Sequence, residues 1–142
     1  MHLIFEYLHI IRSIVDFGLV ILIWMVQLIV YPGFSFYKHE NLFGWHSYYT
    51  PRITVVVAPL MFMQMGISIY FVLFEYSIQN LIYILLVLST WISTFMYFVP
   101  LHQKIEQQTE VKPSVQKLIM GNWVRTIQWT IIFIYGLFLI NS

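Results

Sequence analysis

The stretch NWVRTIQW, residues 122–129, opens an apolar run that continues to Ile140. A run of this length with so few polar residues predicts a membrane-spanning helix, because the hydrocarbon core of a bilayer needs about 20 helical residues. Asn122, Arg125 and the pair Gln128–Trp129 recur at helical spacing, which places them on one face. An arginine inside the bilayer costs at least ~2.5 kcal/mol unless it is paired or hydrated. We therefore expect Arg125 to face other helices of the same protein.

The composition predicts a membrane protein with several spans, whose first partner is the lipid bilayer. Of the 142 residues, 60% are hydrophobic and only 9% are charged, whereas a soluble domain carries about 25% charged residues. The absence of cysteine excludes disulfides and thiolate metal ligands. The formal net charge is +1 and there is no basic tract, so the sequence predicts no nucleic-acid partner.

Four apolar runs of spanning length are separated by polar breaks, which predicts an all-α, integral membrane four-helix bundle formed by one domain over residues 1–142. The first run is expected to end at the helix-stopping sequence Tyr31-Pro32-Gly33. We expect the aromatic connector 34–51 to lie at the membrane interface, partly as a short amphipathic helix. The predicted spans are residues 10–31, 52–74, 81–101 and 118–140, with a short turn at 75–80 and a solvated loop at 103–117.

The distribution of positive residues predicts the orientation in the membrane. One lies at the other side, Arg12, whereas six lie in or beside the first and third loops: Lys38, Arg52, Lys104, Lys112, Lys117 and Arg125. Loops rich in lysine and arginine stay in the cytoplasm. Both termini are therefore predicted to lie outside.

A weak internal repeat connects the two halves of the chain. Val30-Tyr31-Pro32 and Phe98-Val99-Pro100 each precede a polar connector and a helix that begins with a tryptophan and an arginine. The repeat predicts two parallel helical hairpins. The alternative is that helix ends simply favour proline and tryptophan.

Antiparallel spans would bring many polar side chains together at the cytoplasmic end of the bundle. Such convergence is typical of a cofactor or ligand site between helices, but also of a membrane–water interface, and an ion path is a third interpretation. The opposite end offers fewer groups, namely His9, Arg12, Asp16 and Glu75. The side chains expected at the cytoplasmic end are Gln27, Tyr31, His46, Tyr49, Arg52, His102, Asn122, Trp123 and Arg125.

Histidines allow a metal or a haem to be considered as the cofactor. A metal site needs three or four ligands, for which His39, His46 and His102 are the candidates. A haem needs only one or two axial histidines. His46 with His102 would supply them, as would His9 from the other end.

Two classes of function follow from this set. In a membrane oxidoreductase or oxygenase-like enzyme with an apolar small-molecule substrate, His46 and His102 act as ligands or acid–base groups, and Arg125 with Asn122 stabilises an anion or carbonyl. The remaining members would then bind the substrate or cofactor: Gln27, Tyr31, Tyr49, Asn122 and Trp123. In a non-enzymatic membrane subunit, the same polar belt fixes helix packing and docks a lipid, a second copy or a partner protein.

The polar pattern also carries a resemblance across nearly the whole chain. It resembles a family of small, uncharacterised bacterial four-helix membrane proteins, which implies the bacterial inner membrane. These are similar to the anthrone-oxygenase-like membrane family, which implies oxidation of an apolar, aromatic substrate. The residues that carry this resemblance are Gln27, Tyr31-Pro32, Phe34, His46, Tyr49, Ile53, Pro59, Val99-Pro100, His102, Asn122-Trp123, Arg125-Thr126 and Trp129-Thr130.

A second resemblance is to the haem-containing, HemJ-type membrane protoporphyrinogen oxidases. It rests on His9 and on the residues Trp24-Met25 and Tyr31-Pro32. That enzyme type uses a lysine in a later helix, and the predicted spans two to four contain none.

Overall fold

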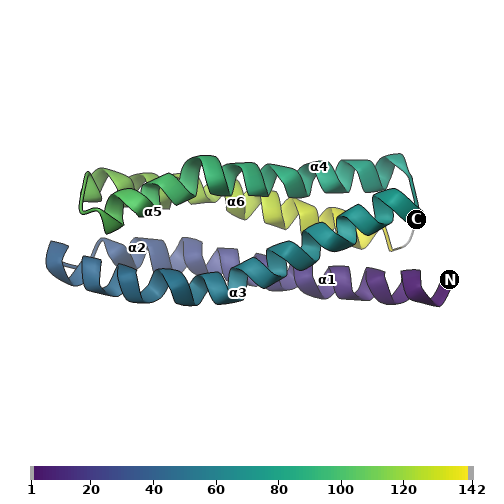
Figure 1. The fold of residues 1–142 in the computed structure, drawn as a ribbon, viewed down its shortest axis with the longest axis horizontal. Coiled ribbons are helices and arrows are strands. Elements are labelled where there is room, and N and C mark those ends of the chain that lie inside the picture. The colour runs from purple at the N-terminus through teal and green to yellow at the C-terminus, as the bar shows by residue number, and fades with distance from the viewer. Residues whose placement is uncertain (1, 141–142) are drawn as a thin grey trace.

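The computed structural model describes residues 2–140 as helices joined by short turns (Figure 1). The first helix is continuous through three segments, α1 (His2–Met25), the π-helical η1 (Val26–Val30) and α2 (Tyr31–Phe34). It is followed by α3 (His39–Phe74). The third helix comprises α4 (Ile78–Ser93), the π-helical η2 (Thr94–Phe98) and α5 (Val99–Glu106), and the fourth is α6 (Val111–Phe138).

The four helices pack as a bundle of two hairpins that run in the same direction, which confirms the predicted fold (Figure 1). Helix α1 packs against both α3 and α6, and α4 packs against the same two neighbours. The turns at 35–38 and 107–110 lie at one end of the bundle, which we call the loop end. The turn at 75–77 and both chain ends lie at the other end (Figure 1).

Apolar side chains occupy both the interior and the outer surface. Leu19, Val87, Leu118 and Ile132 are fully buried in the core. Large apolar side chains also remain exposed along every helix, as expected for surfaces that face lipid. Among the described residues, three helices are long and apolar enough to cross a membrane, namely Leu3–Phe34, His39–Phe74 and Ile78–Glu106. The fourth predicted span, 118–140, overlaps α6, which ends at Phe138 and is not one of these three.

Two π-helical turns explain why the first and third helices extend beyond the predicted stops. Tyr31 N–H bonds to the carbonyl of Val26, and Val99 N–H bonds to the carbonyl of Thr94. A proline follows each of these residues, and a helix can continue past a proline when the preceding turn adjusts locally. The first helix therefore ends at Phe34 and the third at Glu106.

The predicted connectors were too long. Residues 39–51 are not a separate interfacial helix but the beginning of α3, which continues through Pro51 and Pro59. The predicted loop 103–117 shrinks to residues 107–110, because α5 and α6 extend into it from both sides. Gln108 and Glu110 adopt positive φ angles of 54° and 47° in this tight turn. The longer helices bring the histidines of the connectors into the bundle.

Candidate functional site

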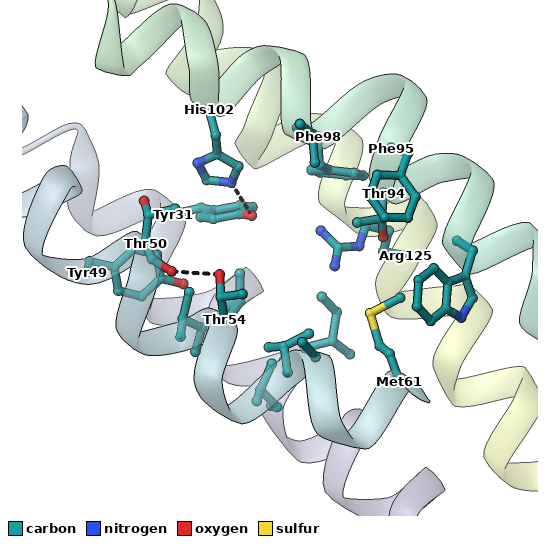
Figure 2. A pocket seen from close by; sticks show the side chains of 18 of the residues that line it. Tyr31, Tyr49, Thr50, Thr54, Met61, Thr94, Phe95, Phe98, His102 and Arg125 are labelled. Carbon is teal, nitrogen blue, oxygen red and sulfur yellow. Dashed lines mark hydrogen bonds between the residues drawn. The ribbon is translucent and has the colours of Figure 1, made fainter. Parts of the chain in front are cut away.

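A cavity of about 390 Å³ lies between the two hairpins, toward the loop end. Its walls are mostly apolar, and the polar exceptions come from both hairpins, with Tyr49 and Thr54 on one wall and Thr94 and Arg125 on the other (Figure 2). That size is within the range of ~300–1,000 Å³ typical of small-molecule sites. The polar side chains that reach the cavity are Tyr31, Tyr49, Thr50, Thr54, Thr94, His102, Gln103, Glu106 and Arg125.

Tyr31 owes its position to the π-helical turn that precedes it. The side chain is buried and packs against Phe34, with ring centroids 5.7 Å apart. Its hydroxyl lies 3.0 Å from Nε2 of His102, which comes from α5 on the opposite wall (Figure 2). A hydrogen bond thus joins the first hairpin to the second at the cavity.

His102 begins a chain of hydrogen bonds that ends at a partly exposed carboxylate. Its Nδ1 lies 2.8 Å from Nε2 of His46, a fully buried residue of α3. The Nδ1 of His46 lies 2.6 Å from Oε1 of Glu106, and Ser47 donates to the other carboxylate oxygen at 2.8 Å. Glu106 is partly exposed. We call Tyr31, His102, His46 and Glu106 the relay, because these groups can pass a proton between the cavity and the surface.

Arg125 enters the same cavity from α6, and its guanidinium points toward the centre (Figure 2). The residue is only 7% exposed. Its Cζ lies 4.3 Å from the ring centroid of Phe98 and 5.0 Å from that of Trp129. It interacts with the hydroxyls of Tyr31 and Tyr49, while its Nε has no hydrogen-bond partner. The prediction that Arg125 faces the interior of the bundle is confirmed.

The structure brings some of the candidate residues together and places others apart. Tyr49 lines the cavity with Tyr31, His102 and Arg125. Gln27 and Asn122 instead pair with each other, since Asn122 donates to the Gln27 side chain at 3.0 Å.

Tryptophan 123 also lies outside the cavity wall. The Trp123 ring makes an edge contact with Trp24, at a centroid distance of 5.8 Å. Trp24 in turn donates to the hydroxyl of Thr130. These contacts join α1 to α6, so the geometry gives Trp123 a packing role.

The histidines are arranged for hydrogen bonding rather than for ligation. Within residues 2–140, no group of three or more histidine and acidic side chains could hold a metal ion. Both ring nitrogens of His46 and of His102 already have partners in the relay. His9 likewise bonds to Arg12 through Nδ1, at 2.9 Å. A haem ligated by His46 or His102 does not fit this arrangement, because an axial bond to either ring would break a hydrogen bond of the relay.

The opposite end of the bundle, where the sequence predicts fewer polar groups, holds a buried polar cluster. Arg12 and Asp16 are both buried. Gln64 donates to Oδ1 of Asp16 at 2.6 Å, and the hydroxyl of Tyr83 lies 2.7 Å from both carboxylate oxygens. Arg12 donates to the carbonyl of Gly136 at 3.1 Å. The spacing of Arg12 and Asp16 by one helical turn was the available signal, since it puts both on one face.

Comparison with known proteins gives no relative: no family model, curated protein or solved structure matches this chain. The resemblances to the anthrone-oxygenase-like and protoporphyrinogen-oxidase families stay predictions that rest on the quoted residues.

Proposed function

We propose that this chain is an integral membrane enzyme of the oxidoreductase or oxygenase-like class, which acts on an apolar molecule taken from the bilayer. The observation that carries the proposal is the cavity itself. An apolar chamber of about 390 Å³ meets a buried arginine and the end of a hydrogen-bonded relay. Apolar walls with a few convergent polar groups are typical of a ligand site.

The lining of the cavity supports entry from the lipid. Phe62 of α3 and Phe95 of η2 belong to the wall, yet they are 64% and 58% exposed. Both lie within helices that are apolar enough to cross a membrane. A molecule dissolved in the bilayer would therefore meet the mouth of the cavity between these two side chains.

The residues around the cavity would have separate roles in substrate binding and proton transfer. Arg125 and Tyr31 would hold the oxygen-bearing end of the substrate. When dioxygen oxidises a substrate, the substrate gives up two electrons and two protons, and dioxygen takes up two electrons and two protons to become hydrogen peroxide. The site must therefore exchange protons between the substrate, the oxygen and water. His102 would accept such a proton at Nε2, and His46 with Glu106 would pass it to water.

The site would lie at the cytoplasmic side of a bacterial inner membrane. Lysines and arginines flank the turns of the loop end, which supports placing this end in the cytoplasm and both termini outside. Thr109→Cys and Tyr76→Cys probe the two ends at exposed positions. Thiol labelling of whole cells with an impermeant reagent should modify only Tyr76→Cys. The reverse pattern would overturn the orientation but leave the cavity intact.

A second candidate function is a non-enzymatic membrane subunit that binds lipid or assembles with a second copy or a partner. It is favoured by the polar pairs that are satisfied inside the bundle. Gln27 pairs with Asn122, and the Gln128 amide donates to the hydroxyl of Ser89 at 3.1 Å. Such pairs fix helix packing without any substrate.

Turnover of a total bacterial lipid extract distinguishes the two functions. The purified protein is placed in nanodiscs with the extract and oxygen, and mass spectrometry follows species that are consumed and formed. The enzyme should convert at least one species to a more oxidised product, and His102→Phe should abolish the conversion. Ala58→Phe places a ring in the wall of the cavity and narrows it, whereas Val55→Phe adds the same ring on the same helix at a position 74% exposed. Conversion should be lost in Ala58→Phe and kept in Val55→Phe. If the wild type and His102→Phe gave the same mass spectra of consumed and formed species, the non-enzymatic subunit would be favoured.

A further inference from the structure

The charge of Arg125 has no counter-charge of its own. Among the described residues, no carboxylate forms an ion pair with this arginine. Its neighbours are two tyrosine hydroxyls and two aromatic rings. Glu106 is the acidic side chain of the same cavity, but its carboxylate is bound by His46 and Ser47. An arginine that is 7% exposed therefore holds an unpaired positive charge beside an apolar chamber.

The other buried arginine shows what the bundle does where no ligand is expected. Arg12 is buried together with a carboxylate, that of Asp16 one helical turn away, and Asp16 Oδ2 and Arg12 Nε both lie within 4 Å of the Cβ position of Gly136. That end of the bundle supplies its own carboxylate, and the cavity does not reach it. A buried charge is costly unless it is paired. The missing partner of Arg125 is then a molecule that enters the cavity.

We infer that the ligand of this cavity is an apolar monocarboxylate, such as a long-chain fatty acid, whose carboxylate pairs with Arg125. The inference rests on the proposed function and names its substrate class. A guanidinium presents a planar set of donors that matches a carboxylate. A single positive charge calls for a single negative one, so a monoanion fits better than a doubly charged phosphate. The apolar walls receive the hydrocarbon, and the mouth beside Phe62 and Phe95 lets a long tail continue into the lipid.

A ligand with a neutral carbonyl would not neutralise the buried charge of Arg125. It offers a dipole to Arg125 but no net charge, so the guanidinium stays unneutralised in a dry site. The free Nε of the guanidinium and the hydroxyl of Tyr49 also suit an anion, since both can donate hydrogen bonds. His102 is hydrogen-bonded to Tyr31 beside this position and would lie next to the carboxylate end of the chain.

Competition binding tests the inference directly. The full-length protein is immobilised in non-ionic maltoside micelles at about pH 8.5, and tritiated hexadecanoate is bound in a scintillation proximity assay. The unlabelled competitors are hexadecanoate, its methyl ester, hexadecanol and hexadecyl phosphate. Hexadecanoate should compete at least tenfold better than the ester or the alcohol, which corresponds to about 1.4 kcal/mol, and also better than the phosphate.

Variants connect the preference to one side chain. Arg125→Gln should bind the ester and the acid equally, and Arg125→Lys should keep part of the preference because it keeps the charge. The matched control is Arg52→Gln, which removes a positive charge from an exposed arginine of the same end that lies over the Tyr48 ring. This control should retain the tenfold preference.

Each alternative outcome overturns the carboxylate. Absence of saturable hexadecanoate binding overturns it, as does equal competition by the ester or alcohol, stronger competition by the phosphate, or an acid preference that survives in Arg125→Gln. Saturable binding of the alcohol that is lost in Ala58→Phe would leave the apolar-substrate function standing. Failure of the carboxylate inference can therefore be distinguished from failure of the proposed function.

Discussion

Replacing Asp16 by alanine should destabilise the bundle more than any other single truncation of an acidic side chain. The Asp16 carboxylate accepts a hydrogen bond from Gln64 at 2.6 Å and lies 2.7 Å from the Tyr83 hydroxyl. It also attracts the guanidinium of Arg12, whose Nε and Nη1 have no hydrogen-bond partners. All four side chains are buried.

The magnitude follows from what the substitution removes. Asp16→Ala removes the acceptor of the hydrogen bonds from Gln64 and Tyr83. A hydrogen bond to a charged group is worth ~1.5–3 kcal/mol, so losing two costs about 3–6 kcal/mol. Tyr83→Phe removes one hydrogen bond to a charged group, which is worth ~1.5–3 kcal/mol. In the double variant, Tyr83→Phe has no carboxylate left to lose. The double loss should therefore fall short of the sum of the single losses by ~0.5–3 kcal/mol.

Equilibrium unfolding by dodecyl sulfate in mixed micelles measures these free energies, with far-ultraviolet circular dichroism as the signal. Glu40→Ala is the matched control, because Glu40 is an exposed carboxylate in the first turn of α3. It should lose no more than ~1 kcal/mol. A loss below ~1 kcal/mol for Asp16→Ala, or strictly additive losses in the double variant, would refute the view that this cluster stabilises the end of the bundle as a unit.

Two further predictions concern packing and the loop end. A Cβ added at Gly121 would lie 2.4 Å from Cε1 of Tyr97, so Gly121→Ala should cost ~1–3 kcal/mol in the same unfolding assay. The control is Gly66→Ala, which should be neutral or stabilising because nothing lies within 4 Å of its new Cβ. Equal changes in the free energy of unfolding for the two variants would contradict the close packing at Gly121. The hydrogen bond from Lys104 lowers the pKa of the exposed Glu110 carboxyl below its ordinary 4.5. Its contribution to stability is therefore fully present above pH 4.5 and is lost as the pH falls through the lowered pKa. Carbon-detected NMR titration should show Lys104→Gln raising this pKa, and an unchanged value would exclude the contact in solution.

Local sequence patterns were sufficient for the class of fold and for one face of α6. Apolar runs of spanning length predicted the bundle, and the cost of a lipid-exposed arginine predicted that Arg125 points inward. The ends of the helices were harder to predict from the sequence. Pro32 and Pro100 read as stops, because the π-helical turns that accommodate them depend on how the chain packs rather than on local propensity.

The spacing of residues along the sequence cannot predict which side chains meet between helices. His46 and His102 were expected at one end, but their pairing with Glu106 requires that α3 and α5 extend past the predicted loops. Asp16 meets Tyr83 across 67 residues of sequence, at a depth and rotation that periodicity does not fix. The buried cluster at that end was missed for the same reason.

The proposal that the cavity holds one apolar molecule from the membrane can be tested by counting bound molecules. Native mass spectrometry of the protein released from nanodiscs of its host's lipids measures this occupancy. The wild type and Val55→Phe should each carry one small apolar molecule per chain, and Ala58→Phe should carry none, because its new ring projects into the cavity and takes the ligand's place. Equal occupancy of Ala58→Phe and Val55→Phe would contradict the proposal, because the bound molecule would then lie outside the cavity.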